Sequence, residues 1–179
     1  MHYVNILSAS LFLLATMLYG QPSLASSEEF DGQKFIESAS VRSISEIETA
    51  KIALENSSSP AIQAYAQRMI TENTVMLDTL HTLARDSQLT MYSDQELRSK
   101  ARKYVFERKG QTFDTAYVNM RALERRKTVS LFRTAINSDE ILFKRYAEAA
   151  LPELMHNLYI AQQLVEQTSS APTLFASKL

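Results

Sequence analysis

Residues 59–83 read SPAIQAYAQRMITENTVMLDTLHTL, and this stretch decides the fold class. Serine is a frequent helix N-cap, and proline suits the first helical position because its missing N–H would be unpaired there. At about 100° per residue, one stripe of this segment collects mostly apolar side chains. The stripe consists of Ile62, Ala66, Met69, Asn73, Met76, Leu80 and Leu83. The pattern predicts a long amphipathic helix that buries one face.

Similar stripes predict three further long helices, and a capping box of Ser93 and Glu96 predicts a shorter one. The long helices are expected over 31–56, 112–136 and from after 138 to about 167, and the short one over 93–110. Pro152 lies inside the last of them and predicts a kink. With only 3 Gly and 4 Pro in 179 residues, the chain lacks the turns of a β sandwich. The sequence therefore predicts an all-α four-helix bundle over residues 26–167, with a short extra helix between helices two and three.

The first 25 residues have the pattern of a signal peptide. Residues 6–20, ILSASLFLLATMLYG, form an uncharged apolar run that is shorter than the ~20 residues of a membrane span. Small residues at Ser23 and Ala25 predict cleavage after Ala25 and a periplasmic or secreted protein. An uncleaved anchor is the alternative, because residues 1–5 contain no Lys or Arg. The Ser-, Thr- and Ala-rich segment 168–179 is expected to form a flexible tail.

Composition excludes several classes of function. The chain has no cysteine, which excludes disulfides, thiolate metal sites and a cysteine nucleophile. Its 19 Lys and Arg against 20 Asp and Glu give a net charge of −1, unlike a dedicated nucleic-acid-binding protein. It also lacks a Gly-rich phosphate loop and a recognisable catalytic triad. We therefore expect a protein that is not an enzyme and binds neither a cofactor nor a nucleic acid.

Charge is distributed unevenly along the chain. Residues 98–133 contain eleven Lys and Arg against three acidic residues, whereas residues 26–97 contain five against twelve. One interpretation is a basic face for an anionic envelope component such as lipid headgroups. The other is that the basic segment 98–133 lies along the acidic first and second helices and forms ordinary ion pairs with them. Nucleic acid is not expected as the partner of this segment, because the chain as a whole is not basic.

Several short strings, in order along the predicted helices, resemble the exported bacterial domain of unknown function 4142 family. They are Ser45-Glu46-Ile47-Glu48 with Ala53; Tyr65-Ala66-Gln67-Arg68-Met69-Ile70; Phe113-Asp114 with Tyr117; Leu131-Phe132; Tyr146-Ala147; Leu151-Pro152; and Leu158 with Ala161. The resemblance covers 31–165 and implies a ferritin-like bundle. It implies no activity, because the family has none that is settled.

A ferritin-like di-metal site needs inward carboxylates and Glu-x-x-His strings from the bundle helices. The resemblance implies three histidine positions, and this sequence has Asn73, Arg125 and Asn157 there. Asparagine is a poor ligand for iron or zinc, and a guanidinium cannot coordinate a metal. One Glu-x-x-His string exists at 153–156, but on the helical wheel His156 points about 140° away from the apolar stripe. We expect His156 to lie on the surface.

Two carboxylates are predicted to point inward, Glu46 on the first long helix and Glu124 on the third. A buried carboxylate needs a partner, and Arg121 or Arg125 could supply it. The sequence therefore predicts a polar core of Glu46, Asn73, Glu124, Arg125 and Asn157 in the place where metal-binding relatives would hold ions. No metal is expected there.

The sequence therefore predicts that the protein is an exported, non-catalytic helical bundle that is associated with stress or with the cell envelope. The alternative is a ferritin-like metal-binding protein that keeps a reduced carboxylate site at Glu46 and Glu124.

Overall fold

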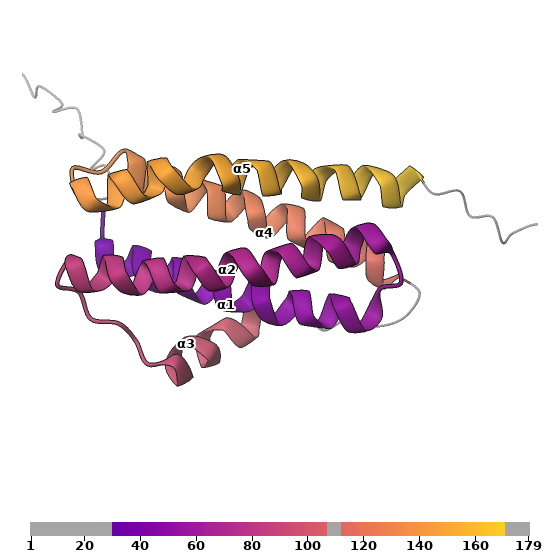
Figure 1. The fold of residues 1–179 in the computed structure, drawn as a ribbon, viewed down its shortest axis with the longest axis horizontal. Helices are drawn as coiled ribbons and strands as arrows, with labels where there is room; N and C mark the ends of the chain where they lie inside the picture. The colour runs from indigo at the N-terminus through magenta and orange to yellow at the C-terminus, as the bar shows by residue number, and fades with distance from the viewer. Residues whose placement is uncertain (1–29, 107–111, 171–179) are drawn as a thin grey trace, which may run out of the picture.

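The computed structural model describes residues 30–106 and 112–170, and it is all-α, with no strand among those residues (Figure 1). The helices are α1 (Gly32–Asn56), α2 (Pro60–Asp86), α3 (Asp94–Ala101), the 3₁₀ helix η1 (Arg102–Tyr104), α4 (Phe113–Ile136) and α5 (Ile141–Ser170). The prediction of four long helices with a short one between the second and third is confirmed. The predicted signal peptide, residues 1–25, lies outside the described residues.

The four long helices form two hairpins, α1 with α2 and α4 with α5, which lie side by side (Figure 1). Helix α3 packs on α1, and the connection that contains it carries the chain back along the bundle. As a result, α2 and α4 run in the same direction, which a short loop could not achieve. A bundle with one long crossover of this kind is the connectivity that ferritin-like folds have.

Most helix ends lie close to their predicted positions. Pro60 is the first residue of α2, and the capping box is present, with both the Ser93 side chain and the Glu96 side chain bonded to backbone N–H groups. Ser59 occupies the N-cap position of α2, but its side chain makes no capping hydrogen bond there. Instead the Gln63 side chain donates a hydrogen bond to the Ser57 carbonyl, which anchors the turn between α1 and α2.

Two predicted boundaries were wrong. Residues 168–170 were assigned to the flexible tail, yet α5 continues through Ser170 and runs past Pro152 without interruption. The hydroxyls of Thr168 and Ser170 donate to the carbonyls of Leu164 and Glu166 one turn earlier, so these polar residues are satisfied within a helix. The short helix ends at Ala101 and gives way to η1, well before the predicted limit at 110. Residues 171–179 lie outside the described part of the chain.

The apolar interior consists of two large clusters at opposite ends of the bundle. One contains Phe35, Ile36, Leu80, Phe132, Phe143 and Leu154, among others. The second includes Ala50, Ala53, Ile62, Tyr65, Phe113, Tyr117 and Leu164. Each cluster takes residues from all four long helices, and on every helix the two sets are separated by a gap along the sequence. That gap defines the middle layer of the bundle.

Candidate functional site

Polar side chains from all four long helices fill the layer between the two apolar clusters. These side chains are Glu46 on α1, Asn73 on α2, Arg121 and Arg125 on α4, and Asn157 on α5. All five are buried, and Arg121 and Arg125 are each only 1% exposed. Large charged residues are almost never this deeply buried unless they are paired. The centre of the bundle is therefore a charged cluster enclosed by apolar layers.

Glu46 holds this cluster together. Its Oε1 accepts a hydrogen bond of 2.8 Å from Nη1 of Arg121, and its Oε2 lies 3.2 Å from Nη2 of Arg125. The two arginines are four residues apart on α4, so both project from the same face of that helix toward α1. One carboxylate thus lies between two guanidinium groups, and the three side chains together carry one net positive charge.

The surroundings of Arg125 compensate for part of that charge. Burial has the largest single effect and would lower the pKa of Arg125, but the attraction of Glu46, together with smaller contributions from Tyr65 and Glu72, outweighs it, and the pKa is raised. Nη2 of Arg125 also lies 2.8 Å from Sδ of Met69. The pKa of Tyr65, which belongs to the adjoining apolar cluster, is raised chiefly by burial. Arg125 therefore stays charged and the phenol of Tyr65 stays neutral.

The two asparagines bind other partners than Glu46. The side-chain amide of Asn73 donates to the carbonyl of Met69 on its own helix, at 2.8 Å. The side-chain amide of Asn157 donates a hydrogen bond to the carboxylate of Glu72, which also pairs with Arg68. Glu72 is a member of the site that the sequence did not reveal, although its position four residues after Arg68 on α2 is a recognisable ion-pair spacing.

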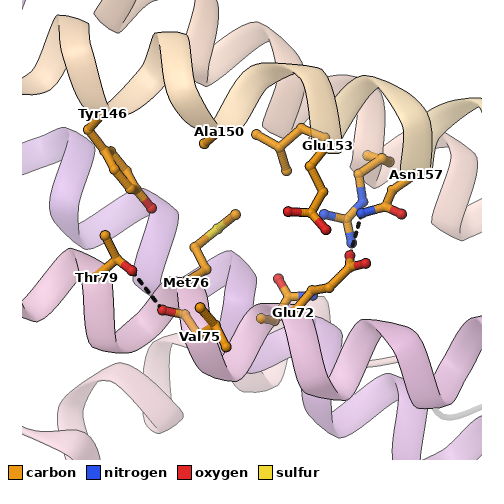
Figure 2. Close-up of a pocket in the computed structure, with 11 residues that line it drawn as sticks. Glu72, Val75, Met76, Thr79, Tyr146, Ala150, Glu153 and Asn157 are labelled. Atoms are coloured by element: carbon orange, nitrogen blue, oxygen red, sulfur yellow. Dashed lines mark hydrogen bonds between the residues drawn. The ribbon is translucent and has the colours of Figure 1, made fainter.

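A pocket of about 130 Å³ opens between α2 and α5 and reaches the central cluster at Arg125 and Asn157. Figure 2 shows Met76 and Glu72 reaching into it from α2, and Tyr146 and Glu153 from α5. Burial and the neighbouring Glu72 both raise the pKa of Glu153. The walls combine apolar side chains with two carboxylates, and no histidine lines the pocket. The two histidines of the described residues, His81 and His156, are exposed, as predicted for His156.

The prediction that Glu124 belongs to the polar core was wrong. Glu124 faces α1 from the side of the bundle, where Oε2 lies 2.9 Å from Nη1 of Arg42 and Oε1 lies 2.7 Å from Nζ of Lys127. Burial raises its pKa, but those two cations outweigh burial and hold the pKa below its usual range. Both of its oxygens are therefore bonded to cations, and neither is directed at Glu46.

The donor set in the middle layer does not fit a metal ion. Both oxygens of Glu46 contact guanidinium groups, which cannot coordinate and whose positive charge repels a cation. Within residues 30–106 and 112–170, no group of three or more His, Asp or Glu side chains is arranged to hold a metal. The two guanidinium groups therefore occupy the contact positions of the Glu46 carboxylate that a bound ion would need.

Some cationic residues of the basic segment 98–133 form ion pairs with the rest of the protein, and others form none within the described residues. Four of its residues pair with carboxylates of α1: Arg98 with Glu48, Lys100 with Glu37, and Arg121 and Arg125 with Glu46. This supports the interpretation that the segment neutralises the acidic first helix. Arg102, Lys103, Arg126 and Arg133 form no ion pair within the described residues, and all four are exposed. Arg108 and Lys109 lie outside the described part.

Substituting Asn73 with leucine tests whether the amide contributes to the cluster. Because its only hydrogen bond is to its own helix, we expect the free energy of unfolding to change by at most ~2 kcal/mol, with the fold intact. Urea unfolding followed by circular dichroism measures this. Asn119→Leu is the matched control, because Asn119 makes the same bond to Thr115 on an exposed face. Loss of folding in Asn73→Leu alone would show that the amide is essential to the centre.

A family model, domain of unknown function (DUF4142), matches residues 19–164 of the 179-residue chain. No curated protein and no solved structure matches the chain. Among the described residues, none of the helices combines the length and the apolar character that crossing a bilayer requires.

Proposed function

The chain belongs to the DUF4142 family, and from this premise we propose that it is an exported, non-catalytic helical-bundle protein associated with the envelope or with stress. The observation that carries the proposal is the carboxylate of Glu46 held between two buried arginines. It supports a non-catalytic role, because a ferritin-like enzyme would need open metal positions in the middle of its bundle, and the middle of this bundle has an ion cluster instead. The single crossover between α2 and α4 supports the ferritin-like comparison.

The alternative, an ion bound by Glu46 and Glu124, has little support from this geometry. The two carboxylates bond to different cations, and Glu124 lies outside the middle layer. A metal would have to displace Arg121 and Arg125 from Glu46 and then overcome their charge.

We propose further that the protein acts by binding an anionic envelope component through the free basic residues of segment 98–133. The internal pairs engage Glu37, Glu46 and Glu48 of α1, whereas Arg102, Lys103, Arg126 and Arg133 form no ion pair within the described residues and remain as surface charge. Surplus charge of one sign attracts partners of the other sign and makes binding depend on salt.

Vesicle co-sedimentation tests this function. The mature protein is expected to bind vesicles containing phosphatidylglycerol at about 0.15 M salt and to release them as salt increases. Vesicles of phosphatidylcholine alone are the control and should not bind. Absence of binding to the anionic vesicles even at low salt would overturn the proposed function.

Export is tested by measuring the mass of the protein in separate cell fractions. If residues 1–25 are a cleaved signal peptide, the mass of the protein isolated from a periplasmic fraction should correspond to a chain that begins at Ser26. Recovery of the full-length chain from the membrane fraction would favour an uncleaved anchor. Recovery from the cytoplasm would contradict export.

A further inference from the structure

A second concave site lies where α1 meets α3 and η1. Its volume is about 300 Å³, and it is lined by Glu37, Ser38, Val41, Arg42, Lys100, Lys103 and Tyr104. We propose that this pocket binds a phosphate group, as a phospholipid headgroup or as a free phosphate ester. The proposal rests on the proposed binding of an anionic component and names the place and chemistry of that binding.

The charge of the pocket favours an anion. Three of its lining residues are cationic and one is acidic, and the acidic residue is already neutralised, because Oε1 of Glu37 accepts a 2.5 Å hydrogen bond from Nζ of Lys100. Arg42 pairs with Glu124, which also pairs with Lys127. The charges of Glu124 and Lys127 cancel, so counting these two neighbours leaves the pocket positively charged. The pocket therefore carries a net charge of about +2.

Lys103 is the cation of this pocket that forms no ion pair with a carboxylate of residues 30–106 and 112–170. Its ammonium lies 5.0 Å from the ring centre of Tyr104, at the edge of the pocket. The hydrogen bond from Lys100 lowers the pKa of Glu37, and the charge of Lys103 adds a smaller effect in the same direction. An ammonium with three donors and no acidic partner in the described residues is available to an incoming anion.

The donors suit a tetrahedral anion. Arg42 uses only Nη1 for Glu124, which leaves its other N–H groups available, and Ser38 adds a hydroxyl. Together with Lys103, these donors come from α1 and η1, so several oxygens of one phosphate group can be bound at once. The volume is near the lower limit of ligand pockets, about 300–1,000 Å³, which suits a headgroup and excludes a bulky polymer segment inside the pocket.

Charge reversal at Lys103 tests the site, with two probes that separate the possible sources of phosphate. Binding of Lys103→Glu to phosphatidylglycerol vesicles and to glycerol 3-phosphate is compared with that of the wild type. Arg145→Glu is the matched control: Arg145 on α5 is also exposed and forms no ion pair within the described residues, the charge change is identical, and it lies outside both the pocket and segment 98–133. Circular dichroism confirms that both variants fold.

We expect Lys103→Glu to weaken binding of at least one probe about tenfold, and Arg145→Glu to change it by less than about threefold. Vesicle binding that both variants weaken equally would show that overall charge and not this pocket binds the vesicles, and would overturn the pocket. Lys103-dependent binding of glycerol 3-phosphate without vesicle binding would keep the pocket and overturn the membrane surface as its source. If wild-type protein binds neither probe, both proposals fail.

Discussion

Replacing Glu46 with glutamine is expected to lower the free energy of unfolding by about 3–5 kcal/mol, because the substitution leaves two buried guanidiniums without a counter-charge. Glutamine has nearly the same size as glutamate, so the loss of stability reflects the missing charge and not a cavity. Chemical denaturation of the two proteins at neutral pH measures it. At this chain length the melting temperature should fall by at least about 6 °C.

Two further variants complete this experiment. Glu48→Gln changes the same charge two residues away on α1, but Glu48 pairs with Lys51 and Arg98 near the surface, so its cost should stay within about 1 kcal/mol. Replacing Glu46, Arg121 and Arg125 together by apolar residues should recover most of the lost stability, because no buried charge is left unpaired. If Glu46→Gln were as stable as the wild type, the cluster would not be the closed, fully charged structure described above.

Replacing Phe35 with alanine is expected to cost about 3–5 kcal/mol. Phe35 is 2% exposed, and its ring lies 5.2 Å from that of Phe132 and 5.6 Å from that of Phe143, both in edge-to-face geometry. The substitution removes these contacts and leaves a cavity in the apolar cluster between α1, α4 and α5. Thermal and urea unfolding measure the effect.

The control for this substitution is Tyr159→Ala, which removes an aromatic ring that is 58% exposed on α5. Its cost should be within about 0.5 kcal/mol, as for most surface substitutions. A loss below about 1 kcal/mol for Phe35→Ala would mean that the hairpins do not pack through this aromatic cluster.

The fold was predictable because the apolar residues recur at helical spacing and the helix starts carry local signals. Pro60 and the capping box at Ser93 mark helix starts that the structure reproduces within a residue. The end of α5 was not predictable in the same way. Thr168 and Ser170 are typical of a loose tail, yet both lie within α5, where their hydroxyls bond to preceding carbonyls.

The site was predictable only in part, because α4 buries two charged residues and exposes apolar ones such as Leu123. Glu46 was correctly expected to point inward, since it lies near the apolar stripe of its helix. Glu124 was placed inside because it lies one turn from Met120, but Met120 is itself 36% exposed. The inward face of α4 carries Arg121 and Arg125 instead. A wheel that assigns the interior from apolar residues cannot identify a buried arginine face until its carboxylate partner on another helix is known.

The central claim is that arginines paired with Glu46, and not metal ions, close the middle of this bundle. The most direct test is the metal content of untagged protein, purified without chelators and measured by elemental mass spectrometry. The geometry predicts iron, manganese and zinc at levels far below one ion per chain. One or two tightly held ions per chain, lost in Glu46→Gln, would contradict it.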